Sequence, residues 1–209
     1  ALLKNWFTYF RIDTTIYIPD RIFEGYGPNK NAMISLASKH DLIICVDCGT
    51  ISFEAISAVK QTDVIVLDHH LGAEKIPDCL AVVNPNRRDE NGDMSHLCAA
   101  AIVFLCLVEC AANLRKRQQK VPNLLQSLDL VALATVADVA PLIGVNRAFV
   151  QSGLKVLSQR ERPGLMALCD SAGVMTSPKA YHLGFVLGPR INAGGRVGQA
   201  DLGAKLFSI

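Results

Sequence analysis

The sequence predicts an α/β domain, with a parallel sheet covered by helices and a mainly helical second half. Short runs at 42–46, 64–67 and 81–83 are apolar at every position, as is typical of strands buried on both faces. Segments with helical periodicity separate these runs, so strands and helices alternate as in βαβ units. We therefore expect one core spanning residues 1–209, with its sheet in residues 1–95 and helices in residues 96–209.

The remaining elements follow from local signals. In the first half these are a β-branched strand at 14–18, a helix at 31–38 capped by Asn29 or Asn31, and a helix from Ser52 to Lys60. In the second half we expect helices at 97–113, 124–140, 147–158, 164–172 and 200–207. The basic segment Arg115–Lys120 links the first two of these, and we favour a solvated loop over a nucleic-acid contact.

The composition indicates a folded protein without a membrane span. Half of the 209 residues are hydrophobic, 19% are charged and the mean hydropathy is positive, which argues against disorder. No apolar run reaches the ~18 residues that a membrane-spanning helix needs. A net charge of +2 and a pI near 8.2 allow an anionic partner without demanding one.

The cysteines favour a reduced, cytoplasmic protein. There are seven, an odd number, and most lie in apolar segments. Cys45-Val46-Asp47-Cys48 matches C-x-x-C, but a zinc site needs a second pair at suitable spacing, and none is present. We favour strand packing over a redox pair for these two thiols.

Two predicted strands end in residues that can bind metal ions. Asp47 follows the run at 42–46, and Asp68-His69-His70 follows the run at 64–67. Ligands of open parallel sheets bind beyond the carboxyl ends of the strands. Carboxylate and imidazole are the mixed donors that suit Mn²⁺, Mg²⁺ or Zn²⁺. An aspartate after a strand can also be a helix N-cap, but two successive strands with this ending favour a metal site.

A third acidic residue lies in the apolar helix predicted at 124–140. Asp138 has small apolar neighbours, and a buried carboxylate there needs a compensating cation. Asp129 lies nine residues earlier, or about 900° around the helix, which places the two acids on opposite faces. At most one can face the strand ends, and the periodicity does not choose between them.

These segments resemble the motifs of a known family. Val46-Asp47-Cys48-Gly49, Asp68-His69-His70 and Val136-Ala137-Asp138 are similar, in this order, to the second, third and fourth motifs of the DHH phosphoesterases. The flanks resemble the RecJ branch of that superfamily. They are Tyr17-Ile18-Pro19-Asp20-Arg21, Glu24-Gly25-Tyr26-Gly27 and the stretch from Leu187 to Arg196.

The resemblance implies a two-metal site, with Mn²⁺ or Mg²⁺, that hydrolyses phosphodiesters. It implies that Asp47 bridges both ions, while His69 and Asp138 ligate one of them. His70 would face the scissile phosphate or complete the metal shell, and Asp68 would ligate a metal or orient the histidines. The implied activity is a 5′→3′ exonuclease on single-stranded DNA, in DNA repair and recombination.

The resemblance also implies a nucleic-acid-binding groove. Arg190 and Arg196 bracket Asn192-Ala193-Gly194-Gly195, which we interpret as a small-residue turn whose N–H groups approach an anion. Arginine matches phosphate oxygens well, although a surface turn with solvated arginines has the same pattern. The resemblance places this segment, with Asn192, in the groove together with Arg21.

The sequence departs from the family at both ends. The family's first motif, an Asp-x-Asp-x-x-Gly turn, is absent, and so is its C-terminal DHH-associated domain. We therefore expect artificial boundaries at both ends, and a chain that by itself binds metal weakly and does not turn over DNA. The alternatives are another DHH phosphoesterase, cleaving short oligoribonucleotides, cyclic dinucleotides or pyrophosphate, and a non-catalytic DNA-binding scaffold.

Overall fold

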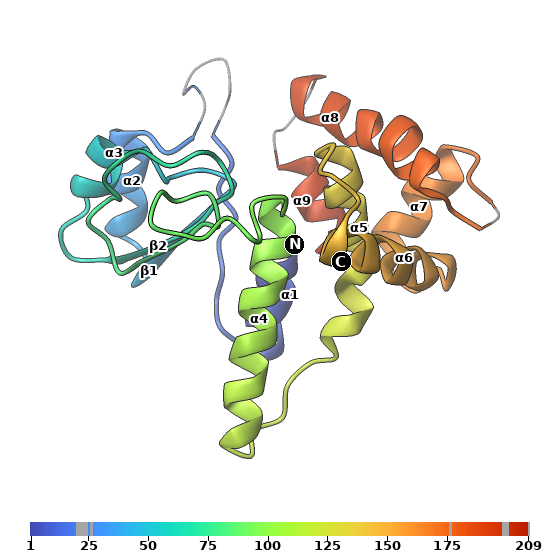
Figure 1. Cartoon of the computed structure of the whole chain (residues 1–209), viewed down its shortest axis with the longest axis horizontal. Coiled ribbons are helices and arrows are strands. Elements are labelled where there is room, and N and C mark those ends of the chain that lie inside the picture. The colour runs from blue at the N-terminus through green and yellow to red at the C-terminus, as the bar shows by residue number, and fades with distance from the viewer. Residues whose placement is uncertain (20–24, 26, 176, 198–200, 209) are drawn as a thin grey trace. The chain divides into compact units, whose positions relative to one another are not determined.

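The chain forms two units in this computed structural model, which describes residues 1–19, 25, 27–175, 177–197 and 201–208. One unit comprises residues 19–102, and the other comprises residues 1–18 and 103–209. The side chains of residues 195–197 also lie outside the description. Residues 19–102 are called the sheet unit and the other residues the helical unit, and the elements of both are drawn in Figure 1.

The sheet unit contains three parallel strands, β1 (Leu42–Val46), β2 (Asp63–Leu67) and β3 (Ala81–Val83), in the order β1-β2-β3. Val46 pairs with Leu67, and Leu67 pairs with Val83, so the three strands end at the same edge. The pairing continues one residue further, because the Asp47 N–H donates to the Leu67 carbonyl over 3.0 Å and the Asp68 N–H donates to the Val83 carbonyl over 3.1 Å. The predicted parallel sheet is confirmed.

Two short helices contribute to the core of this unit, α2 (Lys30–Ala37) and α3 (Phe53–Ser57). Met33 of α2 and Ile56 of α3 are almost fully buried in one apolar cluster with side chains of all three strands. Asn29 caps α2 by accepting a hydrogen bond from the Ala32 N–H, which settles the choice between the two candidate caps. Ser52 precedes α3 without a side-chain cap, and α3 ends before Lys60.

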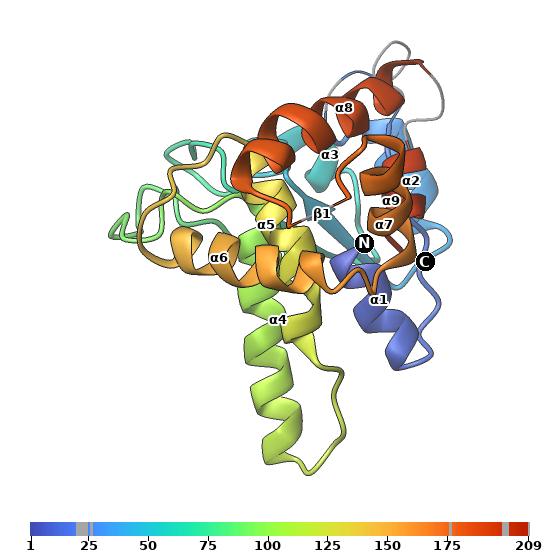
Figure 2. The same ribbon diagram turned by 90° about the vertical axis from the view of Figure 1, so that its right-hand side faces the viewer.

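The helical unit is built from the remaining helices (Figures 1 and 2). They are α1 (Leu2–Tyr9), α4 (Ala99–Lys116), the 3₁₀ turn η1 (Leu124–Ser127), α5 (Leu128–Ala137), α6 (Gly144–Ser158), α7 (Pro163–Ser171), the π-helix η2 (His182–Leu187), α8 (Gly188–Val197) and α9 (Leu202–Leu206). The first residues of α4 belong to the sheet unit. Among the described residues, the helices lack the combination of length and apolar character that crossing a membrane requires.

The helices α5 and α6 cross at very short range. Gly153 of α6 lies against the first turns of α5, so that a Cβ atom at this position would be 2.1 Å from the Leu128 carbonyl oxygen and 2.5 Å from the Ala132 Cβ. Any side chain would force the two helices apart. Helix α5 is buried along most of its length, as its nearly uniform apolar sequence predicts.

Besides the Ser52 cap and the length of α3, three local predictions were wrong. Residues 14–18 form no strand, because their β propensity finds no neighbouring strand to pair with in the described sheet. The expected small-residue turn around Asn192 is helical, since η2 continues directly into α8. Pro189 is tolerated there because the preceding π-helical turn already interrupts the i→i−4 hydrogen bonds. Finally, Arg115 and Lys116 belong to the last turn of α4 and not to a loop.

Candidate metal centre

Asp47 stands at the end of β1 in an unusual backbone conformation. Its φ angle is 63°, and its side chain is 61% exposed. Aspartate tolerates this left-handed conformation better than most residues, and such outliers gather at functional sites. Gly49 has a φ of 114°, and a Cβ atom there would lie 3.1 Å from both Val66 methyl groups. The turn after β1 is therefore held close to β2.

Asp68, at the end of β2, is buried and acts as a hydrogen-bond acceptor for its surroundings. One carboxylate oxygen accepts the Thr50 N–H over 3.0 Å. The other lies 2.8 Å from the His69 N–H and 2.7 Å from Nδ1 of His70. Only 1% of Asp68 is exposed, so the carboxylate faces these donors instead of solvent.

These hydrogen bonds keep Asp68 ionised. Burial by itself would raise its pKa, but the hydrogen bonds from His70 and Thr50 and from the His69 N–H outweigh burial and lower the pKa to about 2. A charged carboxylate at this position holds Nδ1 of His70 as a donor. Nε2 of His70 is then the nitrogen left to bind a metal or a substrate.

The ligand atoms of Asp47, His69 and His70 meet beyond the strand ends. Nε2 of His69 lies 3.0 Å from Oδ1 of Asp47, and one ligand atom from each of the three residues lies within 4.8 Å of the others. In an octahedral shell with ligands at ~2.1 Å, neighbouring ligand atoms are ~3.0 Å apart and opposite ones ~4.2 Å apart. The 3.0 Å separation of the Asp47 and His69 atoms therefore fits two neighbouring ligands of one divalent cation, and the donor chemistry suits Mn²⁺.

Three further residues, which the sequence analysis did not single out, hold this segment in place. Asn84, which is 2% exposed and follows β3, donates from Nδ2 to Thr50 Oγ1 and to the His70 carbonyl, both over 2.8 Å. Asn86 donates to the His69 carbonyl over 2.6 Å. The sequence contained one signal for Asn84, because this residue follows the third apolar run. Side chains at the carboxyl ends of parallel strands converge on the same site.

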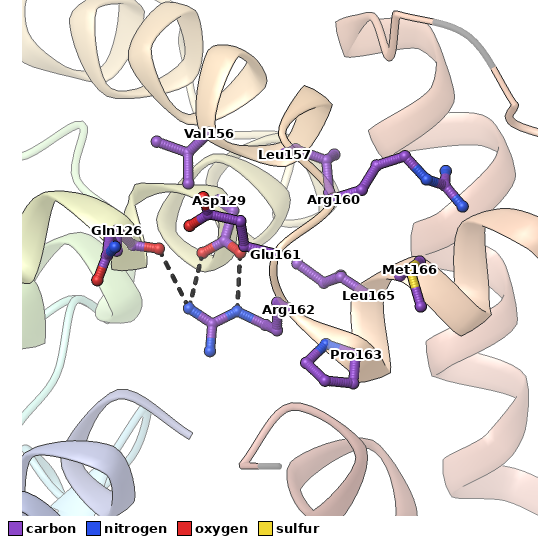
Figure 3. A pocket seen from close by; sticks show the side chains of 10 residues that line it. All are labelled: Gln126, Asp129, Val156, Leu157, Arg160, Glu161, Arg162, Pro163, Leu165 and Met166. Atoms are coloured by element: carbon purple, nitrogen blue, oxygen red, sulfur yellow. Dashed lines mark hydrogen bonds and ion pairs between the residues drawn. The ribbon is translucent and has the colours of Figure 1, made fainter.

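The two acids of the long helix have different surroundings. Asp129 lies in the first turn of α5 and is 3% exposed, whereas Asp138 follows the last residue of α5 and is exposed. Figure 3 shows the Arg162 guanidinium beside the Asp129 carboxylate, with contacts of 2.7 Å from Nε and 3.1 Å from Nη2. Asp129 is therefore engaged in a buried ion pair within the helical unit.

The predicted nucleic-acid contacts lie on α8 or outside the described residues. Arg190 and Asn192 are exposed on α8, and Arg190 donates from Nη1 to the Val186 carbonyl over 2.7 Å. Arg196 belongs to α8, but its side chain is outside the description, as is Arg21. Arg190 and Arg196 are carried by a helix and not by an anion-binding turn.

The C-x-x-C pair does not have the character of a reactive dithiol. Burial raises the pKa of Cys45 to about 11 and that of Cys48 to about 12. Both thiols are free, with Cys45 buried beside the apolar core and Cys48 partly buried. A reactive thiol needs a lowered pKa, so these side chains fit the packing role that the sequence favoured.

A parallel sheet with carboxylate and imidazole donors at its strand ends defines an α/β protein with a candidate divalent-metal site. The chain belongs to the DHH family, because the model described as "DHH family, N-terminal domain" matches residues 1–135. This match includes the motifs that contain Asp47 and Asp68-His69-His70, and it ends before the motif that contains Asp138.

Several relatives and solved structures similar to the chain bear the name RecJ. A single-stranded-DNA-specific exonuclease RecJ of Dickeya dadantii is 36% identical over 205 residues, covering 91% of this chain and 35% of the relative. The protein of the same name from Escherichia coli is 35% identical over 201 residues, covering 91% and 35%. A crystal structure of exonuclease RecJ bound to manganese matches with a TM-score of 0.88 at 32% identity, covering 99% of this chain and 52% of that one. The chain spans about a third of the length of these curated relatives.

Proposed function

We propose that the chain carries the metal-binding part of a Mn²⁺-dependent exonuclease that hydrolyses single-stranded DNA in the 5′→3′ direction, in DNA repair and recombination. The observation that carries this proposal is the convergence of Asp47, His69 and His70 at the strand ends. It is supported by relatives named as single-stranded-DNA-specific exonucleases and by a neighbour described as bound to manganese.

Each residue of the cluster has a part in this proposal. Asp47 and His69 hold a metal ion, and Asp68 orients His70 through the 2.7 Å contact with Nδ1. His70 directs its other nitrogen to the ion or to the scissile phosphate. A bound pair of divalent ions would supply the activated water and stabilise the attacking and leaving oxygens. Asp138 is proposed as a metal ligand only because its motif resembles the fourth motif of the family.

Most of the proposed DNA contacts come from helix α8 of the helical unit. Arg190 and Asn192 are exposed on α8 and offer a guanidinium and an amide to phosphate oxygens. Arg196 and Arg21 join them only through the resemblance. A guanidinium remains protonated, so these arginines bind substrate and do not exchange protons with it.

Metal binding by the 209-residue chain is the first test. Titration with Mn²⁺, followed by electron paramagnetic resonance of the free ion, should show saturable binding that Asp47→Ala and His69→Ala each weaken at least about tenfold. Asp41→Ala and His40→Ala are matched controls, because they remove the same residue types just before β1. Equal effects of the two pairs would refute the strand-end site.

The substrate is tested in a protein in which this chain replaces the matching third of the Escherichia coli relative. We expect Mn²⁺-dependent release of nucleotides from the 5′ end of single-stranded DNA, and little release from duplex DNA. Cleavage of short RNA or cyclic dinucleotides in preference to long single-stranded DNA would indicate another DHH phosphoesterase. Metal-independent DNA binding without hydrolysis would indicate a scaffold.

A further inference from the structure

An open hollow of about 460 Å³ lies in the helical unit, between the end of α1 and the end of α4 with the loop that follows it. Tyr9 lines it from α1, and Arg115, Gln119, Lys120 and Asn123 line it from the other side. None of these residues belongs to the strand-end cluster, which is in the sheet unit. The hollow is therefore a separate feature of the chain.

The hollow lies within a strongly cationic segment. Arg115, Lys116, Arg117 and Lys120 are all exposed, and the sequence contains no acidic residue between Cys110 and Leu128. Among the described residues, the recorded ion pairs involve none of these four cations. Cations in the last turn of α4 interact favourably with the helix dipole. Lys120 lies beyond that turn and makes no such interaction.

Tyr9 places an aromatic ring beside these cations. It is 47% exposed, and its ring makes an edge contact with Phe10 at a centroid distance of 5.0 Å. Phe10 makes the same kind of contact with Trp6, also at 5.0 Å, and Trp6 is 7% exposed. A row of rings thus anchors an exposed tyrosine to the core and limits its freedom before any ligand binds.

An exposed, oriented ring next to unneutralised cations is the combination that binds single-stranded nucleic acid. We propose that this hollow is an accessory site for a single strand, in which one base stacks on Tyr9 and Arg115 and Lys120 hold neighbouring phosphates. An acidic peptide would satisfy the charges but would supply no flat group for the tyrosine ring. The proposal rests on the proposed function only in taking a single strand as the natural ligand, and the site itself requires no metal.

The test measures the affinity of the 209-residue chain for a fluorescent oligothymidylate of about 12 nucleotides by anisotropy, in EDTA at several salt concentrations. Arg115→Ala combined with Lys120→Ala should weaken binding and reduce the slope of log K against log salt by about 1.4, or about 0.7 for each lost phosphate contact. Lys39→Ala combined with Lys155→Ala is the matched control, because it removes two exposed lysines elsewhere. This control should leave both affinity and slope unchanged.

Stacking is tested separately from charge. Tyr9→Ala should weaken binding at least about fivefold without changing the salt slope, whereas Tyr9→Phe should retain the affinity. An oligomer of abasic sites should bind equally to the chain with Tyr9 and to the Tyr9→Ala variant. Unchanged oligothymidylate binding in both the double variant and Tyr9→Ala would overturn the proposal. Polyglutamate serves as the acidic peptide for comparison. If the variant with Arg115→Ala and Lys120→Ala lost polyglutamate binding but kept oligothymidylate binding, the hollow would be a peptide site and the proposal would be overturned.

Failure of this proposal can be distinguished from failure of the proposed function. Asp47→Ala and His69→Ala should remove Mn²⁺ binding but leave oligothymidylate binding in EDTA largely in place. The Tyr9→Ala variant and the Arg115→Ala, Lys120→Ala double variant should keep Mn²⁺ binding but bind oligothymidylate more weakly. If oligothymidylate binding in EDTA depended on Asp47 and His69 and not on Tyr9, Arg115 and Lys120, the accessory site would be refuted while the metal site stood.

Discussion

The Nδ1 atom of His70 lies 2.7 Å from a carboxylate oxygen of Asp68, which is itself buried and accepts the backbone N–H groups of Thr50 and His69. This contact connects the interior of the sheet unit to an exposed imidazole. Because the carboxylate is ionised, it fixes the orientation of the ring and the position of its proton. The exposed nitrogen of His70 thus depends on a residue that solvent scarcely reaches.

Asp68→Asn should weaken Mn²⁺ binding by about 10- to 100-fold, because the amide cannot accept hydrogen bonds at both of its terminal atoms. Free Mn²⁺ measured by electron paramagnetic resonance gives the affinity. Asp63→Asn, at the exposed start of β2, is the control and should bind as the unchanged chain does. Normal affinity in Asp68→Asn would mean that His70 needs no oriented ring.

Asn84→Ala should also weaken Mn²⁺ binding, since it removes the bonds that join Thr50 to the carbonyl of His70. Loss of these buried bonds should lower the free energy of unfolding by about 1–3 kcal/mol. The metal titration is run well below the unfolding temperature, so that stability does not decide its result. Asn91→Ala, in an exposed loop, should alter neither quantity, and equal behaviour of the two variants would exclude a positioning role for Asn84.

The two acids of the α5 region should respond in opposite ways. Asp129→Ala leaves the Arg162 guanidinium, with a side chain 13% exposed, without its partner and should lower the free energy of unfolding by about 3 kcal/mol or more. Asp138→Ala, at an exposed position, should change stability little but reduce Mn²⁺-dependent hydrolysis in the chimeric enzyme. Urea unfolding and the nuclease assay measure the two effects. A shared phenotype would contradict the assignment of Asp138 as a ligand.

Gly153→Ala should destabilise the helical unit by at least about 2 kcal/mol, although alanine is the better helix former. The cause is the 2.1 Å approach that its Cβ would make to the Leu128 carbonyl oxygen. Gly194→Ala in α8 is the matched control, because nothing lies within 4 Å of a Cβ added there. Thermal unfolding should show a neutral or stabilising effect for Gly194→Ala; equal effects of both substitutions would refute the close crossing of α5 and α6.

Cys45 and Cys48 should react slowly with iodoacetamide at pH 8. Their pKa values, raised to about 11 and about 12 by burial, leave only a small fraction of each as thiolate at that pH, and the thiolate is the reactive form. Raising the pH should increase their reactivity, whereas unfolding the chain should expose them at once. Cys110, which is exposed, serves as the internal standard in mass spectrometry, and faster alkylation of Cys48 than of Cys110 would contradict the prediction.

The sheet and the strand-end cluster were predictable because their signals are local. The strands coincide closely with the three apolar runs, and the first two runs stop at the residues that carry the chemistry, Asp47 and Asp68. Parallel pairing then brings these residues to one edge without further information. The DHH motifs are readable for the same reason, since each is a short segment whose residues act together.

Other properties depended on contacts between segments distant in the sequence. Periodicity placed Asp129 and Asp138 on opposite faces, but only the position of Arg162, 33 residues away, shows that Asp129 is held in an ion pair. The roles of Thr50 and Asn84 likewise come from a hydrogen bond across 34 residues.

The sequence by itself determined the sheet, the order of the motifs and the donor types of the metal site, because these follow from neighbouring residues. The tertiary structure decided that 14–18 does not join the sheet, that the segment around Asn192 is helical, and that Tyr9 lies beside Arg115. Strand pairing, continuation of a helix across a proline and the meeting of two distant helix ends are set by packing partners. A residue's own propensity does not contain that information.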